Sequence, residues 1–395
     1  MSISYRLLGQ DDADASRRLG QEAFGFWPDP PPASVPYPAA GNYGHAAFDG
    51  DELVARLIAR EYASHFAGAQ IPTCGVAGVT VQAEYRGRGL LTDLFAAAFV
   101  AAGARGEVLS TLFPTAPRIY RKFGYELVGE RCTVEIPSSA LANIAVPQGI
   151  RVRRAAAADF TAIERVYAGW ASGQHGPLTR SGPNFTTTAE EFIGEFNGVT
   201  VAVDSADQVV GFASWDRGQG YDSAATLRVS DLIALTPVAA QALWSVVGSF
   251  ASVTGQLRVD TSGDDLARLV LPGLSWRVVK SDPYMLAVID VTAAFSLRSA
   301  PLTVGAELSF SVAGHPINAQ NGNYRLAVDG GAMDCRRGGS GGRTFTAQGL
   351  ALGYAGTQSS GNLRLAGHLA GGNSGEDSIW DAVFGGHQFH IRDYF

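Results

Sequence analysis

The feature of this sequence that most restricts its fold is an Arg- and Gly-rich turn between a strand pattern and a helix pattern. The strand pattern covers residues 75–83, the turn is Arg86-Gly87-Arg88-Gly89, and the helix pattern covers residues 88–102. Such a turn directs free backbone N–H groups and the positive end of a helix dipole at one spot. Glycine lets a phosphate approach the backbone closely, and arginine supplies counter-charge. The turn therefore predicts a diphosphate site, although a strand–helix turn with solvated arginines fits the same short motif.

The turn lies within an alternation of strands and helices that we assign to an N-terminal unit, residues 1–145. Asp49-Gly50-Asp51 is a hairpin signal, and the prolines between residues 28 and 38 predict a stiff loop. This order of elements predicts a mixed sheet with helices on its faces, an α/β unit. The predicted strands are residues 3–8, 45–48, 53–60, 75–83, 108–113 and a run from 126, and the predicted helices are 11–24, 88–102 and a segment around Tyr120.

The same order of elements recurs in residues 146–288, which we interpret as a degenerate second copy. A strand and an amphipathic helix are predicted in residues 151–170, a hairpin in 199–215, a strand in 226–235, a helix in 238–253 and a strand in 256–260. The composition then changes to Gly, Ser, Thr and β-branched residues. Strands at 307–312 and 323–328 with Gly-rich turns predict an α+β third unit, residues 289–395.

Charge and cysteine usage exclude several classes of protein. The formal net charge of -7 argues against a nucleic-acid partner. Three widely spaced cysteines make neither a disulfide framework nor a zinc motif. We find no signal-peptide pattern and no apolar run long enough for a membrane span, which predicts a cytoplasmic protein without a membrane partner. His387 and His390 are spaced like a metal pair, but no third ligand is apparent, so we expect no metal.

A second motif lies about 30 residues after the turn, in the segment Arg118-Ile119-Tyr120-Arg121-Lys122-Phe123-Gly124-Tyr125. Together the two stretches resemble the GNAT superfamily of N-acetyltransferases. In that superfamily an R-x-x-G-x-G/A turn grips the pyrophosphate of coenzyme A, and a Y-x-x-x-G-F/Y segment follows. Here the turn continues with Leu90 and Leu91, and Leu91 stands where the superfamily has Gly or Ala. The resemblance implies acetyl-coenzyme A as the cofactor.

Two acetyltransferase-like units, of which the second lacks the phosphate turn, and a sterol-carrier-protein-like third unit resemble the Eis (enhanced intracellular survival) family. The resemblance implies that Tyr120 is the general acid and that the C-terminal carboxylate, here on Phe395, is the base. It also implies that the V-x-V strand, Val79-Thr80-Val81, binds the pantetheine arm and that Thr115 lies near the cofactor. Members acetylate aminoglycosides, often at several positions, or lysine side chains, and they assemble as hexamers, trimers of dimers.

The implied chemistry is physically reasonable. A phenol with a pKa near 10 can protonate a departing thiolate of comparable basicity. Residues 385–395 alternate like a half-buried strand, which could bring Phe395 beside the N-terminal unit. Candidates for an acceptor pocket are Phe24, Phe26, Trp27 and Tyr37 as walls, with Asp29 and Asp393 attracting a cationic amine; aromatic core packing is the alternative.

The rival functions are a peptide or protein lysine acetyltransferase, a lipid or sterol carrier, and a coenzyme A sensor without catalysis.

Overall fold

The computed structural model describes residues 3–25, 35–263, 265, 267–270 and 275–395. The strands and helices predicted for the N-terminal unit are all present in it. Helix α2 begins two residues later than predicted, because Gly89 adopts a left-handed φ of 83° and caps it. Its apolar positions, from Leu90 to Ala102, face the core as the spacing predicts. The elements are β1 Ile3–Leu7, α1 Ala13–Phe24, β2 Asn42–Asp49, β3 Glu52–Phe66, β4 Ala69–Val81, α2 Leu90–Ala104, β5 Leu109–Leu112, α3 Pro117–Arg121 and β6 Glu126–Pro137.

The second unit repeats this order, which confirms the predicted tandem copy. Its last strand, β12, was not predicted, and it leaves the second unit to pair with the first. The elements are β7 Arg151–Arg154, α4 Phe160–Ser172, α5 Ala189–Glu195, β8 Gly198–Val203, β9 Val209–Arg217, β10 Thr226–Ala234, α6 Pro237–Gly248, β11 Gln256–Ser262, α7 Ala267–Val270 and β12 Arg277–Val288.

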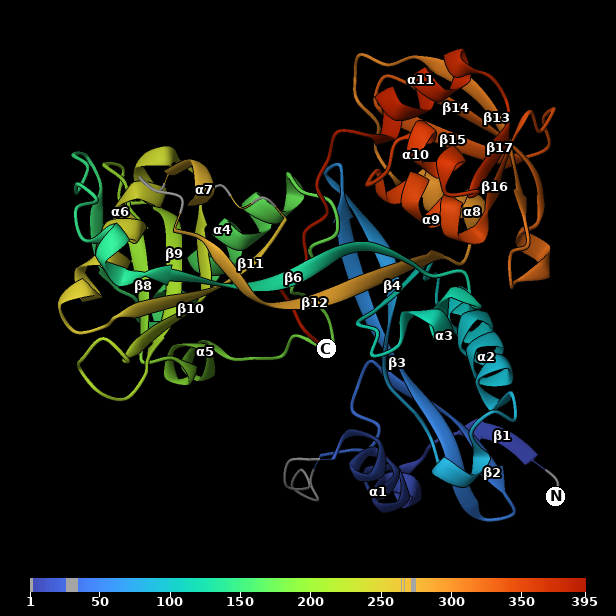
Figure 1. The fold of residues 1–395 in the computed structure, drawn as a ribbon, viewed down its shortest axis with the longest axis horizontal. Helices are drawn as coiled ribbons and strands as arrows, with labels where there is room; N and C mark the ends of the chain where they lie inside the picture. Colours follow the sequence, from blue (N-terminus) through green and yellow to red (C-terminus); the bar gives the residue numbers. More distant parts are fainter. Residues whose placement is uncertain (1–2, 26–34, 264, 266, 271–274) are drawn as a thin grey trace.

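One continuous sheet therefore connects the two units. Its strand order is β1-β2-β3-β4-β5-β12-β6-β11-β10-β9-β8-β7. Strand β12 pairs with β5 on one side and with β6 on the other, and its residues Tyr284 to Val288 are fully enclosed. Figure 1 shows the long strands β6 and β12 crossing from one lobe to the other. Hydrogen bonding along these strands fixes the two units relative to each other.

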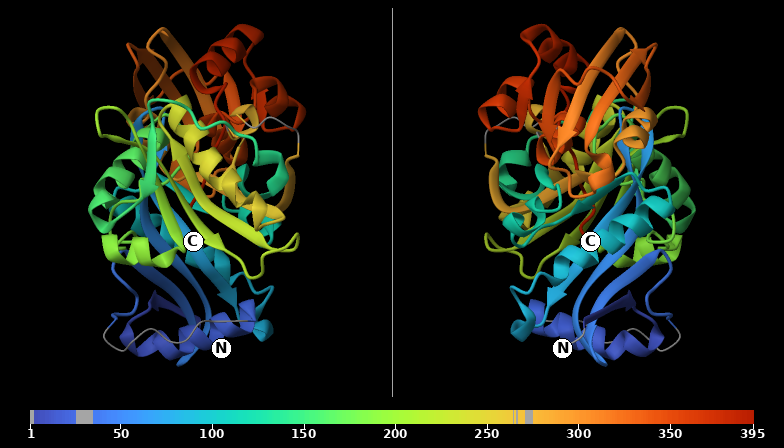
Figure 2. Two further views of the ribbon diagram at one scale, coloured as in Figure 1. Left: turned by 90° about the vertical axis from the view of Figure 1, so that its left-hand side faces the viewer. Right: turned by 90° about the vertical axis from the view of Figure 1, so that its right-hand side faces the viewer.

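The third unit is an α+β lobe with a sheet of order β15-β14-β13-β16-β17. Its centre is filled by large aromatic side chains, among them Phe295, Phe310, Tyr354 and Trp380. Figure 2 shows this lobe above the N-terminal unit. The elements are α8 Val291–Leu297, β13 Ala306–Ala313, β14 Gly322–Asp329, β15 Ala332–Arg337, β16 Arg343–Thr346, α9 Ala347–Ala355, α10 Ser360–Leu365, β17 Leu369–Gly371 and α11 Ser374–Phe384.

The tail, residues 385–395, is not the strand that its alternation suggested. It is extended, but its only ladder pairing in the described chain is a single bridge between Phe389 and His175. Hydrogen bonds with both GNAT-like units hold it instead: the Arg131 Nε donates to the carbonyl of Arg392 at 3.0 Å, and the Arg392 guanidinium donates to the backbone carbonyl of Asp260 at 2.8 Å. Figure 1 shows this segment descending from the third lobe to end between the first two.

None of the helices that the structure describes is both long enough and apolar enough to cross a bilayer.

Candidate active site

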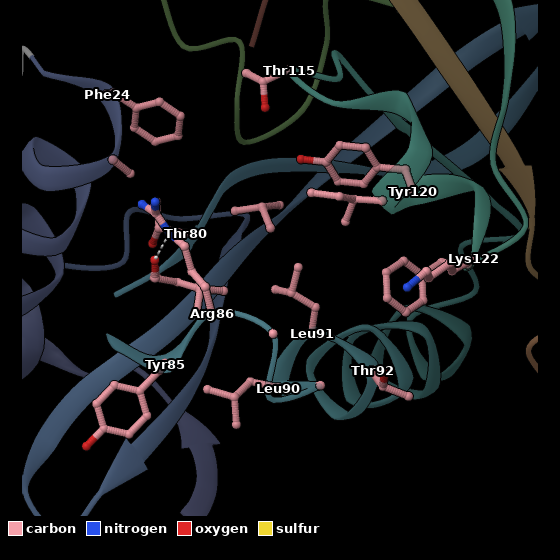
Figure 3. Close-up of a pocket in the computed structure, with 17 residues that line it drawn as sticks. Phe24, Thr80, Tyr85, Arg86, Leu90, Leu91, Thr92, Thr115, Tyr120 and Lys122 are labelled. Atoms are coloured by element: carbon pink, nitrogen blue, oxygen red, sulfur yellow. Dashed lines mark hydrogen bonds between the residues drawn. The ribbon is translucent and has the colours of Figure 1, made fainter. Parts of the chain in front are cut away.

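The Arg/Gly turn borders a cavity of about 580 Å³, which we call the turn cavity (Figure 3). It lies between the end of β4, the start of α2 and the helix α3. Its lining residues are Ala23, Phe24, Val79, Thr80, Val81, Tyr85, Arg86, Gly87, Gly89, Leu90, Leu91, Thr92, Thr115, Ile119, Tyr120, Lys122 and Phe123.

The strand β4 diverges from its parallel neighbour beside this cavity. It pairs with β5 only at residues 73–75, whereas on its other edge β3 pairs with it as far as Val81. The backbone of residues 79–81 therefore has no β5 partner on the side that lines the turn cavity. Backbone N–H and C=O groups need partners, so this edge suits a ligand with amide groups.

Only one of the two predicted phosphate-binding arginines lines the turn cavity. Arg86 lines it, and its Nε donates to Val81 O at 3.3 Å. Arg88 lies outside the lining residues, because its guanidinium lies over the Tyr85 ring and donates to Glu84 O at 2.8 Å. Leu91, the departure from the superfamily pattern, lines the cavity and is drawn in Figure 3.

Tyr120 is held in α3 within an aromatic cluster and is only 6% exposed. Its ring makes edge contacts with Phe95 and Tyr125. Burial raises the pKa of the Tyr120 phenol above 10.0, and a hydrogen bond with Thr115 lowers that pKa in part. Figure 3 shows the hydroxyl pointing toward the side where Thr115 and Phe24 lie. The phenol therefore keeps its proton at neutral pH and faces the cavity.

A second cavity of about 650 Å³, which we call the tail cavity, meets the turn cavity at Tyr120. The two share Phe24, Val79, Thr115 and Tyr120. A ligand in one cavity can thus meet a ligand in the other beside the phenol. The remaining lining residues are Val35, Pro36, Tyr37, Pro38, Ala39, Asn42, Arg56, Ile58, Arg60, Val76, Ala77, Gly78, Phe113, Asn184, Tyr394 and Phe395.

Phe395 lines the tail cavity, as the end of the chain was predicted to do. Its ring packs against Tyr62 at 4.9 Å and Phe113 at 5.6 Å between centroids. Asp393, in contrast, is not among the lining residues: it forms an ion pair with Arg180 at 2.8 Å and accepts a hydrogen bond from the Tyr167 hydroxyl at 3.2 Å. Its carboxylate is therefore already bound within the protein.

Phe24 lines both cavities and Tyr37 lines the tail cavity, whereas Phe26, Trp27 and Asp29 lie outside the described residues. Sequence reasoning missed Lys122 in the turn cavity and Arg56 and Arg60 in the tail cavity. The two arginines stand four residues apart in a predicted strand. Residues an even number of positions apart in a strand point to the same face, so this spacing could have placed both arginines on one face.

The two spaced histidines have other contacts. His387 stacks on His175 at 4.1 Å, and His390 Nδ1 lies 3.2 Å from Ser262 Oγ. The described part of the chain holds no group of three His, Cys, Asp or Glu side chains suited to a metal.

Gly75 should be essential for the position of Phe395. A Cβ added at Gly75 would lie 2.5 Å from the Tyr62 ring and 2.9 Å from the Phe395 ring, so both must move. The Eis resemblance implies that the terminus of Phe395 takes part in the reaction, and on that expectation Gly75→Ala should lower catalytic turnover roughly tenfold. Steady-state kinetics measure this, and Gly103→Ala on α2, where an added Cβ meets nothing, is the matched control. Equal turnover in both variants would contradict the prediction.

A comparison with protein families and a comparison with individual proteins both find N-acetyltransferases similar to this chain. Residues 4–128 and residues 176–286 each match a family described as acetyltransferase (GNAT) domain. An uncharacterized N-acetyltransferase of Streptomyces coelicolor is 30% identical over 285 residues, which cover 68% of each chain.

Solved structures show the same fold over the full length. A GCN5-related N-acetyltransferase from Kribbella flavida has 28% identity and a TM-score of 0.82, and the match covers 100% of this chain and 99% of that one. Eis1 from Mycobacterium abscessus has a TM-score of 0.79 with 100% of both chains covered. At 20% identity, the likeness to Eis1 is one of fold.

Proposed function

The chain belongs to the GNAT N-acetyltransferases, and on that premise we propose that it transfers acetyl from acetyl-coenzyme A to a primary amine, with Tyr120 as general acid and the α-carboxylate of Phe395 as base. The observation that carries the proposal is the meeting of the turn cavity and the tail cavity at Tyr120. One cavity then takes the acetyl donor and the other the amine.

The residues of the turn cavity fit coenzyme A. Backbone N–H groups at the start of α2 and the Arg86 guanidinium suit the pyrophosphate, and Lys122 adds a second cation. The edge of residues 79–81 that has no β5 partner suits the amides of the pantetheine arm, and Arg86 Nε occupies only Val81 O on it. When bound, acetyl-coenzyme A supplies an activated thioester.

The chain's own groups then move two protons. The Phe395 carboxylate takes the proton that the ammonium must lose before its nitrogen can attack. The Tyr120 phenol, protonated because burial raises its pKa, gives a proton to the departing sulfur. The aromatic rings around both groups restrict water.

Arg86 should matter more than Arg88 for binding of the cofactor. We expect Arg86→Ala to raise the Kd for acetyl-coenzyme A roughly tenfold, since it removes a charge-assisted hydrogen bond to phosphate. Arg88→Ala is the matched comparison from the same turn and should change the Kd less, because its guanidinium lies over Tyr85. Calorimetric titration measures both, and an equal or larger effect at Arg88 would contradict the assignment.

The acceptor is tested with a panel of amines. Release of free thiol from acetyl-coenzyme A is followed with aminoglycosides and lysine peptides, and products are identified by mass spectrometry. Multiple acetyl groups on an aminoglycoside would support the acceptor class that the Eis resemblance implies, and activity on peptides alone would favour a lysine acetyltransferase. Tight cofactor binding without transfer to any amine would instead favour a coenzyme A sensor.

The third unit is better suited to a scaffold than to a lipid or sterol carrier. Aromatic rings fill the interior of this lobe, and Trp380 and Phe384 stand 4.5 Å apart between centroids. Its tail also delivers Phe395 to the tail cavity. The sterol-carrier-like fold and the hexamer remain proposals from the Eis resemblance, and light scattering on the purified protein tests the hexamer.

A further inference from the structure

The tail cavity has one basic wall, formed by strand β3. Arg56, Ile58 and Arg60 stand at alternate positions of β3, and all three line the cavity. Alternate residues of a strand point to the same face of the sheet. The β3–β4 register places Arg56 opposite Thr80 and Arg60 opposite Gly75. The two guanidinium groups therefore lie at different points along β4, one opposite Thr80 and the other opposite Gly75.

Arg56 is held in place by neutral hydroxyl groups. Arg56 is 3% exposed, and its Nη1 donates to Ser16 Oγ at 2.5 Å and to the Tyr37 hydroxyl at 3.5 Å. Arg60 is half-buried and lies near Tyr62, whose ring packs on Phe395. Burial raises the pKa of the Tyr62 phenol, and the nearby Arg60 guanidinium lowers that pKa in part, so Arg60 lies close to the end of the tail.

The described lining residues of the tail cavity include no Asp or Glu side chain. Asp393, the residue of the tail expected to attract a cationic amine, is instead paired with Arg180. The Phe395 α-carboxylate that we propose as base offsets one of the two guanidinium charges, so the described lining still carries a net positive charge, which attracts anions and repels additional cations. This charge pattern is unfavourable for a polycation and favourable for a ligand with a carboxylate or phosphate.

We propose that the acceptor is a primary amine that also carries an anionic oxygen group, which Arg60 binds while the amine reaches Tyr120. The inference rests on the proposed acetyl transfer and narrows its substrate class. A guanidinium binds carboxylate and phosphate oxygens through paired N–H donors, so either group fits the same site. The covalent step is unchanged: the ammonium gives one proton to the base, an N–C bond forms, the C–S bond breaks, and the thiolate takes the proton of Tyr120. The nitrogen loses its second proton as the amide forms, and a proton returns to the Tyr120 phenolate.

Small amines matched in size, and one larger polycation, test the charge preference. We compare γ-aminobutyrate with its neutral amide and with the dication putrescine, and phosphoethanolamine with ethanolamine, using kanamycin as the polycation. The expected kcat/KM for at least one anionic amine exceeds that of its neutral partner about tenfold or more. A preference for γ-aminobutyrate over its amide would identify a carboxylate as the bound group, and a preference for phosphoethanolamine over ethanolamine would identify a phosphate.

The outcomes separate this inference from the proposed function. Transfer to putrescine or kanamycin with higher kcat/KM than to either anionic amine would overturn the inference and leave acetyl transfer standing. Acetylation of no amine in the panel would overturn both.

Variants of Arg60 test its assigned role. Arg60→Gln should raise the KM for the preferred anionic amine about tenfold, with little change in kcat or in the KM for its neutral partner. Arg60→Lys should restore part of the preference, because it keeps the charge. Arg325→Gln, which removes an exposed arginine of the third lobe, is the matched control. An equal loss on charged and neutral amines, or a loss mainly in kcat, would assign Arg60 to positioning Phe395 and overturn the inference.

Discussion

Tyr120→Phe is expected to lower kcat by roughly 10²–10⁴ while the Kd for acetyl-coenzyme A changes little. The substitution removes only the hydroxyl that donates to the departing sulfur, and the ring contacts with Phe95 and Tyr125 remain. Rapid-mixing kinetics measure the acetyl-transfer step, and fluorescence or calorimetric titration measures the affinity.

Tyr125→Phe is the control for this substitution. Tyr125 lies in the same aromatic cluster and is fully buried, but it lines neither cavity, and its hydroxyl contacts Ser110 at 2.6 Å. We expect its kcat to stay within a few-fold of the parent. A Tyr120→Phe enzyme as fast as the Tyr125→Phe enzyme would remove Tyr120 from the mechanism.

The pH profile follows from the same burial. Because burial raises the pKa of Tyr120 above 10.0, the protonated form persists to higher pH than in water. The acid function is therefore present from neutral pH upward and is lost only as pH rises through the raised pKa. We expect no loss of kcat from Tyr120 between pH 7 and about pH 9, and a fall within that range would assign the acid to another group.

Local patterns were sufficient to predict most elements of the two GNAT-like units. The apolar spacing of α2 and the Asp-Gly hairpin are determined by neighbours in sequence, so they appear directly in the chain. Strand β12 was missed because residues 284–288 are apolar without alternation, as expected for a strand enclosed on both faces. Its partners, β5 and β6, lie more than a hundred residues earlier in the sequence, so no pattern within residues 277–288 could have identified them.

Only those residues of the site that belong to a sequence motif could be predicted. The turn and Tyr120 belong to motifs, and the structure places both on one cavity. The charge of the tail cavity depends on which face of β3 meets the tail, which sequence spacing does not determine. The alternation of residues 385–395 predicted a strand, but these side chains alternate because they pack between two lobes, without a ladder to join.

Extending the chain beyond Phe395 is expected to lower kcat by roughly 10²–10⁴, the range for loss of a general base. Tyr62 and Phe113 hold the Phe395 ring, and Phe395 lines the tail cavity, which limits where the carboxylate that we propose as base can lie. Added residues would convert that carboxylate to a neutral amide and move the terminal charge away. Steady-state kinetics of a protein with a short Gly-Ser extension measure the effect, after intact-mass analysis has verified a free α-carboxylate on Phe395 in the parent.

Two controls separate the charge from the packing. The same Gly-Ser residues placed before Met1 should leave kcat unchanged, since they do not alter the tail. Phe395→Leu keeps the α-carboxylate but removes the ring contacts with Tyr62 and Phe113, so we expect it to lose less activity than the extension. If Phe395→Leu were as slow as the extended protein, the ring would be the essential group. Full activity in the extended protein would exclude the carboxylate as base, and the amine would then have to lose its proton to water or to another group of the tail cavity.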